Sequence, residues 1–207
     1  MSAGYLHHVF PKTIEILCEK KIIYLQEQFF KTLREQLLVN TEGDVSRWFP
    51  VFLKFQGVRP EILEVAEFEY LRHFALELED TKLKLDPGQV GLNPSAQFVE
   101  LHYHQIKLNR SSGLYCFFKK NNSLEEFKLN LSQALVIDLI HEERKFSLDQ
   151  LALQAATHKM GGSLNLQSWK NIICEMLAMG LLLDLGHLNY ENKKDSEDIY
   201  QSNIPNQ

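Results

Sequence analysis

Residues 128–155 read KLNLSQALVIDLIHEERKFSLDQLALQA, and residues 165–184 read NLQSWKNIICEMLAMGLLLD. Apolar residues recur there at helical spacing, which predicts three consecutive helices over 131–142, from Ser147 onward, and over about 165–179. Ser147 and Gln150 have the spacing of a capping box, which marks the start of the second helix. Gly180 follows the third helix and indicates where it ends.

The segment before these helices is richer in aromatic and branched residues, which favours strands. Asn121 and Asn122 suit a tight hairpin between the last two strands. Further upstream, residues 81–96 contain several prolines and glycines, and this composition predicts a linker. The predicted strands are 98–108, 113–119, 124–129 and a short one over 181–185.

The first eighty residues have the periodicity of helices, with Pro11 and Pro60 in the first turn of two of them. The predicted helices cover 11–19, 20–38, 42–56 and 60–80. One face of the last helix is acidic, and it carries Glu61, Glu64, Glu67, Glu69, Glu77 and Glu79.

The predicted fold is therefore α+β. An N-terminal helical bundle is followed by a three-stranded antiparallel sheet and three helices in winged-helix-like order. The predicted divisions are a helical domain over 1–90, a peptide-binding domain over 91–188, and a polar, disordered tail over 189–207.

Composition narrows the class of protein. The chain has 207 residues and a formal net charge of -5, which disfavours nucleic-acid binding. Its cysteines, Cys18, Cys116 and Cys174, are scattered through apolar stretches and are expected to be buried reduced thiols. We expect a cytoplasmic protein, because the start lacks a signal-peptide pattern and no apolar run reaches the ~18 residues that span a membrane.

The sequence shows no motif for nucleotide binding, a hydrolase nucleophile or a metalloprotease. His102 and His104 would share one face of a predicted strand, but no carboxylate or third histidine stands beside them. We therefore expect a solvated strand face there, no metal or other cofactor in this chain, and no catalytic residue.

A winged-helix-like module can bind DNA through its third helix or a peptide through a free sheet edge. The outward face of the third helix offers Gln167, Lys170, Asn171 and Glu175, which is a poor surface for phosphates. This favours peptide binding. A winged-helix DNA-binding transcriptional regulator is the alternative, and an enzyme that acts without a partner is a second one.

Three short motifs occur in a defined order: Leu129-Asn130, Ser147 to Ala152, and Gly180 to Leu182. In this order they resemble the PqqD-like domains called RiPP recognition elements. Upstream blocks resemble a broader family of HvfC-like partner proteins, encoded beside iron-dependent peptide-modifying enzymes. These blocks are HVFPKTIEIL (8–17), RWFPVFLK (47–54), PEILEVAEFEYLRH (60–73) and LNPSAQFVEL (92–101). The resemblance covers roughly residues 5–185, and a chain this short is most similar to the members that serve methanobactin biosynthesis.

The resemblance implies a non-catalytic subunit of a heterodimer with an MbnB-like TIM-barrel enzyme, which holds the iron. The pair would use dioxygen to convert cysteines of an MbnA-like precursor peptide to oxazolone–thioamide units. The precursor's leader is expected to add as a strand beside the third predicted strand. The predicted leader-binding residues are Leu124, Glu125, Glu126, Phe127, Lys128, Lys170 and Asn171. The predicted partner interface is the aromatic cluster Trp48, Phe49 and Phe52.

Overall fold

A computed structural model describes residues 3–17, 19–36, 45–78, 88–143, 146–162 and 164–184. Its mixture of helices and two small antiparallel sheets confirms the α+β class. The contacts divide the chain into two units. The first combines Met1–Glu79 with Gln97–Lys128, and the second combines Asp80–Ala96 with Leu129–Gln207. The predicted tail, 189–207, lies outside the described residues.

The helices of the first unit begin where the prolines predict. Pro11 opens α2 and Pro60 opens α5, each in a first turn where a missing N–H is tolerated. A 3-10 turn, η1 (Val45–Arg47), precedes the aromatic helix. The α-helices are α1 (Ala3–Val9), α2 (Pro11–Leu17), α3 (Glu19–Gln36), α4 (Trp48–Phe55) and α5 (Pro60–Glu77).

Aromatic rings form the centre of the helical core. Phe49 is fully buried, and its ring lies 4.9 Å from that of Phe10 and 5.1 Å from that of Phe29. Leu6 and Leu53 are also fully buried in this cluster. Burial of this much apolar surface is the main favourable term for the helical part of the unit.

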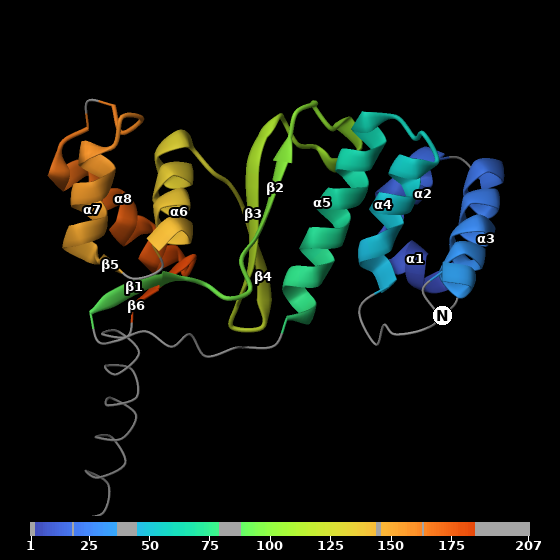
Figure 1. Cartoon of the computed structure of the whole chain (residues 1–207), viewed down its shortest axis with the longest axis horizontal. Coiled ribbons are helices and arrows are strands. Elements are labelled where there is room, and N and C mark those ends of the chain that lie inside the picture. The colour runs from blue at the N-terminus through green and yellow to red at the C-terminus, as the bar shows by residue number, and fades with distance from the viewer. Residues whose placement is uncertain are drawn as a thin grey trace, which may run out of the picture. The chain divides into compact units, whose positions relative to one another are not determined.

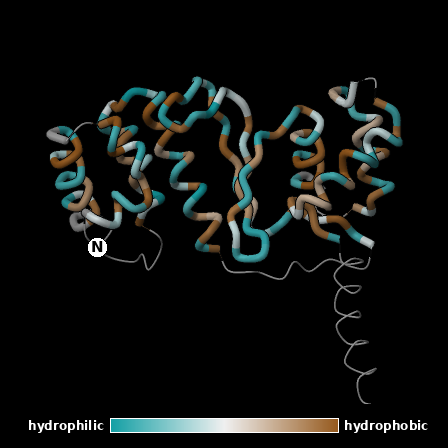
Figure 2. Tube along the Cα trace, turned by 180° about the vertical axis from the view of Figure 1, so that it is seen from behind, coloured by the Kyte–Doolittle hydropathy of each residue, from teal (hydrophilic) through white to brown (hydrophobic). Residues whose placement is uncertain are grey.

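The sheet of the first unit has the strand order β2-β3-β4. Its strands are β2 (Gln97–Leu101), β3 (Gly113–Lys120) and β4 (Ser123–Lys128). The strands predicted over 113–119 and 124–129 are confirmed, whereas the one predicted over 98–108 ends at Leu101, and Ile106–Leu108 form a 3-10 helix. The turn between β3 and β4 places Asn121 and Asn122 at φ values of 51° and 61°, as a type I′ turn requires. Figure 2 shows this turn as hydrophilic.

Helix α5 packs along one face of this sheet (Figure 1). The ring of Phe68 meets Phe117 edge-on at 4.8 Å and Tyr115 at 5.8 Å. Ile62 and Ala66 of the same helix belong to the helical core. Helix α5 thus presents apolar side chains both to the sheet and to the helical core, so the sheet and the N-terminal helices belong to one unit. The predicted division at residue 90 placed them in separate domains.

The acidic face predicted for α5 is only partly exposed. Glu64 and Glu69 are buried, with exposures of 8% and 7%. Glu64 accepts hydrogen bonds from the backbone N–H groups of His102 (3.0 Å) and Tyr103 (3.2 Å), and from the side-chain amide of Gln105 (3.0 Å). A buried carboxylate is stable only when hydrogen-bond donors surround it. These three donors hold the backbone just after β2 against α5.

The second unit contains the three helices predicted for the C-terminal half, α6 (Leu131–Glu143), α7 (Leu148–Thr157) and α8 (Leu166–Met179). Its sheet has the order β5-β1-β6, with β1 (Gln89–Leu92) antiparallel to both neighbours. The outer strands are β5 (Phe146–Ser147) and β6 (Leu182–Asp184). The linker prediction over 81–96 is therefore wrong for β1, because two distant segments supply its hydrogen-bonding partners.

Side-chain caps set the starts of these helices. Asn130 and Gln133 exchange hydrogen bonds of 3.0 and 2.9 Å before α6, which gives the Leu129-Asn130 motif a physical role. Ser147 and Gln150 form the predicted capping box at α7. Asn93 links β1 to the end of α8, because its side-chain amide donates to the carbonyl of Gly180 at 3.0 Å.

Candidate functional site

Strand β4 lies at an edge of its sheet: among the described residues it pairs with β3 and with no other strand. Its register places Glu126 opposite Phe117 and Phe127 opposite Cys116. Alternate residues of an antiparallel edge strand direct their N–H and C=O groups away from the sheet. The edge therefore offers unpaired backbone groups to an incoming extended peptide.

Leu124, Glu126 and Lys128 are alternate residues of β4 and share one face of the strand. Leu124 packs against the apolar cluster around Phe68. Glu126 forms ion pairs with Arg110, next to β3, and with Arg72 of α5 at 3.7 Å. The hydrogen bond from Arg110 to Glu126 is the main cause that raises the pKa of Arg110.

Lys128 is also engaged within the unit. Its ammonium group donates to the hydroxyl of Ser111 at 2.8 Å and to the carbonyl of Ser112. Together with the ion pairs of Glu126, these bonds hold the charged side chains of Glu126 and Lys128 against their own unit. A peptide that pairs with β4 must therefore use the backbone edge more than these charges.

Glu125 and Phe127 project from the opposite face of β4. The ring of Phe127 stacks on Phe118 of β3, with centroids 5.8 Å apart and planes 17° apart. Phe127 remains partly exposed, and it is the aromatic side chain that β4 can offer to a bound peptide.

Lys170 and Asn171, the two helix residues predicted to contact the leader, lie on α8 in the second unit, whereas β4 lies in the first. Lys170 forms an ion pair of 2.6 Å with Asp149 of α7. The side chain of Asn171 accepts a hydrogen bond of 3.0 Å from Gln167. Both residues thus have partners within their own unit.

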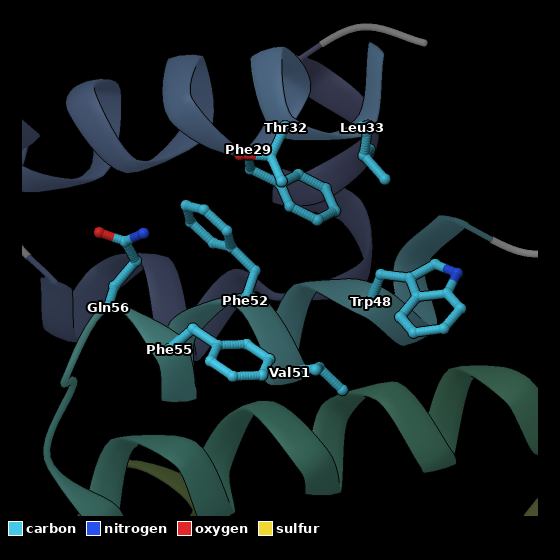
Figure 3. Close-up of a pocket in the computed structure, with 8 residues that line it drawn as sticks. All are labelled: Phe29, Thr32, Leu33, Trp48, Val51, Phe52, Phe55 and Gln56. Atoms are coloured by element: carbon cyan, nitrogen blue, oxygen red, sulfur yellow. The ribbon is translucent and has the colours of Figure 1, made fainter. Parts of the chain in front are cut away.

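The structure separates the three residues of the predicted partner surface. Trp48 and Phe52 line a hollow of about 500 Å³ between α3 and α4, which we call the α3–α4 groove (Figure 3). Phe49 instead lies at the centre of the helical core and cannot contact another protein. The groove is lined by Phe29, Thr32, Leu33, Trp48, Val51, Phe52, Phe55 and Gln56.

Sequence reasoning missed Val51 and Phe55, although the signal was present. Trp48, Val51, Phe52 and Phe55 are spaced i, i+3, i+4 and i+7, which is one stripe of a helix. Phe55 is 84% exposed, the largest exposure of a big apolar side chain in the described part of the chain. An exposed aromatic ring beside an apolar hollow is typical of a protein interaction site.

The histidines at 102 and 104 do not share a strand face, because β2 ends at Leu101. A carboxylate does stand beside His102, contrary to expectation: Glu64 Oε1 lies 3.1 Å from His102 Nδ1. Within the described residues, no group of three or more acidic, histidine or cysteine side chains is arranged to hold a metal ion.

The described cysteines differ from each other. Cys116 on β3 is fully buried, and burial raises the pKa of its thiol to about 12. Cys174 on α8 is exposed, so the expectation of a buried thiol is wrong there, because the residue points away from the face formed by Trp169, Ile173 and Met176. Cys18 lies outside the described residues.

No family model matches the chain, and no curated protein matches it either. None of the described helices combines the length and the apolar composition that a membrane crossing requires.

Proposed function

We propose that this protein is a non-catalytic partner subunit that binds the leader of a ribosomally made precursor peptide. The leader adds as an antiparallel strand to the open edge of β4. The observation that carries the proposal is the pairing of β4, residues Ser123–Lys128, with β3 alone among the described strands. Glu126 and Lys128, two of the charged side chains of this strand, bind groups of their own unit, and the pairing proposed for the leader uses the backbone edge.

The energetics of strand addition are adequate for specific binding. Each backbone hydrogen bond contributes a net ~0.5–1.5 kcal/mol. Four or five such bonds sum to roughly 2–7.5 kcal/mol, so a micromolar complex, at ~8 kcal/mol, also needs apolar contacts such as one at Phe127 to offset the ordering costs. A micromolar complex lets the leader dissociate after its precursor has been modified.

The second subunit in this proposal is an MbnB-like iron enzyme with a TIM-barrel fold. It holds the iron and converts cysteines of an MbnA-like precursor to oxazolone and thioamide groups in methanobactin biosynthesis. The resemblance to HvfC-like proteins supports this partner, and MbnC is the member that the chain most resembles. Such a complex would form in the cytoplasm, where the precursor is made.

The proposal includes a winged-helix-like module, predicted from the sequence as three strands followed by three helices, although these strands belong to the first unit and these helices to the second. In the second unit, α6, β5, α7, α8 and β6 follow one another in the order helix, strand, helix, helix, strand. The reciprocal cap between Asn130 and Gln133 supports the reading of Leu129-Asn130 as the entry motif of the first helix. The ion pair between Lys170 and Asp149 neutralises the basic residue that a DNA-binding helix would use for phosphate contacts.

The decisive experiment combines two measurements on the full chain. A tagged chain should co-purify with an iron enzyme encoded beside it, and it should bind the synthetic leader of the neighbouring precursor with micromolar affinity. The chain alone, supplied with iron and air, should leave the full precursor unmodified by mass spectrometry. Oxidation of the precursor by the chain alone would overturn the proposal, as would tight, salt-dependent DNA binding without leader binding.

A further inference from the structure

The α3–α4 groove has an apolar floor and an exposed rim. The rings of Phe29 and Phe52 point toward each other between the two helices, with centroids 5.3 Å apart (Figure 3). Val51 and Phe55 on the rim are 41% and 84% exposed. A surface of this kind loses much apolar exposure when another molecule covers it, which favours binding.

The α4 side of the groove is basic. Residues 45–59 contain Arg47, Lys54 and Arg59 and no acidic residue. The guanidinium of Arg47 lies over the ring of Trp48, with its carbon 4.7 Å from the ring centroid, so a charge is held at one end of the groove. Lys54 is exposed and adjoins Phe55 in the sequence.

One acidic side chain, Glu67 of α5, interacts electrostatically with Lys54. Burial raises the pKa of Glu67, and the positive charge of Lys54 acts in the opposite direction. The carboxylate of Glu67 therefore offsets part of the positive charge of Arg47, Lys54 and Arg59. The α4 side of the groove still carries more positive than negative charge. The complementary ligand carries carboxylates beside its apolar side chains.

The shape of the groove indicates which kind of ligand fits. Both walls are helices, and the apolar residues of α4 recur at helical spacing, so a third helix can lay its apolar stripe between them. A small molecule is usually enclosed over most of its surface. The exposure of Phe55 is too high for such an enclosure. A second copy of the chain would bring two basic α4 sides together, which is unfavourable.

We propose that the α3–α4 groove receives an acidic amphipathic helix of the partner enzyme. Its large apolar side chains pack over the floor formed by Phe29 and Phe52, cover Val51 and Phe55, and place carboxylates near Arg47 and Lys54. The inference rests on the proposed function, since it identifies the contact through which the enzyme is held. The leader site on β4 is separate and stays free for the precursor.

The first test uses three synthetic peptides and the full chain. Two amphipathic peptides share an apolar stripe of leucine and phenylalanine and differ only in having glutamate or lysine beside it. The third is a scrambled form of the glutamate peptide without a stripe. By fluorescence anisotropy, the glutamate peptide should bind at least about tenfold more tightly than either of the others. Equal binding of the glutamate and lysine peptides, or no binding of the glutamate peptide, overturns the proposal.

The second test uses matched variants. Phe55→Asp should weaken binding of the glutamate peptide by roughly tenfold or more. Ile106→Asp is the control, because Ile106 belongs to the same unit and is 81% exposed, close to the 84% of Phe55. It should bind as the unmodified chain does, and both variants should keep the circular dichroism of the parent. Equal losses in both variants would overturn the assignment to the groove. Arg47→Glu should shift the preference toward the lysine peptide.

The third test separates this inference from the proposed function. With the co-purifying iron enzyme, Phe55→Asp should lose the enzyme and keep its affinity for the leader. If Phe55→Asp retains the enzyme, the groove assignment is wrong and the proposed function stands. If the unmodified chain retains no iron enzyme, the proposed function fails, and the groove as the enzyme's docking site fails with it. Sedimentation should show a monomer; a dimer that Phe55→Asp dissociates would assign the groove to a second copy and overturn the proposal.

Discussion

Thr13 donates two hydrogen bonds to the carboxylate of Glu69, from its backbone N–H at 2.9 Å and from its hydroxyl at 2.7 Å. The N–H of Lys12 donates a third at 2.6 Å. Both residues lie in the first turn of α2, where N–H groups have no partner within the helix. A buried side chain of α5 thus caps α2, and this joins two helices that are distant in the sequence.

Replacing Glu69 by alanine should destabilise the fold by about 2–4 kcal/mol, because it leaves buried donors without a partner. Thr13→Val removes only the hydroxyl and should cost about 1 kcal/mol. Urea unfolding followed by circular dichroism measures both. Glu27→Ala on the exposed face of α3 is the control and should change stability by less than about 0.5 kcal/mol. A loss for Glu69→Ala as small as that of the control would contradict the capping role.

Stability should also depend on pH through Glu69. Burial raises its pKa above the ordinary value of 4.5, and the hydrogen bonds from Lys12 and Thr13 oppose this. A carboxyl group with a raised folded-state pKa holds its proton more tightly in the folded chain. The stability that protonated Glu69 contributes is therefore fully present below the pKa that Glu69 has in the unfolded chain. It is lost as pH rises through the pKa that Glu69 has in the folded chain. Glu69→Gln cannot ionise, so the stability of the parent relative to this variant should fall as pH rises from the ordinary value of 4.5 through the raised folded-state pKa of Glu69. A difference that stays constant over this range would show that the pKa of Glu69 is not raised.

Proline in β4 should reveal whether the leader uses this edge. Glu126→Pro and Phe127→Pro remove N–H groups from adjacent positions, which point to opposite sides of the strand. The variant that loses the outward donor should bind the synthetic leader more weakly by roughly 1–3 kcal/mol. The other should mainly disturb the hairpin. Isothermal titration calorimetry measures the affinities.

The structure requires an alanine control for each proline. Glu126→Ala loses the ion pairs with Arg72 and Arg110 but keeps the backbone N–H. Phe127→Ala loses the stack on Phe118 and also keeps its N–H. A proline variant is evidence for strand pairing only if it loses more leader affinity than the alanine variant at the same position does. If both folded proline variants match their alanine controls, the leader binds elsewhere.

The cysteines should react at very different rates. In a Cys18→Ser background, a thiol reagent should modify Cys174 quickly, because this residue is exposed on α8. Cys116 should react only when the chain unfolds, because its thiol is buried and its pKa is raised to about 12. Removing the fast phase by Cys174→Ser confirms the assignment. A fast phase that persists in Cys174→Ser would show that Cys116 is accessible.

Local features could be predicted from the sequence because their partners are close neighbours. The capping box of Ser147 and Gln150 has both of its hydrogen bonds, at 2.9 and 3.3 Å. Gly180 ends α8 with a φ of 86°, in the left-handed region that favours glycine. Such signals depend on the intrinsic geometry of a few consecutive residues.

The candidate site was predictable only in part. Helical periodicity identifies α4 as aromatic, but it does not show which ring faces the core, and Phe49 proved to be inside while Trp48 and Phe52 line the groove. Alternation in β4 shows two faces, but it does not show that Glu126 pairs with Arg110. Such facts depend on neighbours supplied by other elements.

The sequence by itself determined where the α2, α5, α7 and α8 helices begin or end, and that Asn121 and Asn122 form a hairpin turn. Only the tertiary structure decided that Gln89–Leu92 is a strand, since its partners are the segments Phe146–Ser147 and Leu182–Asp184. It also decided that the β2–β3–β4 sheet packs on α5. The physical reason is that an apolar pattern tells which side of an element must be covered, whereas the covering element is chosen by the packing of the whole chain.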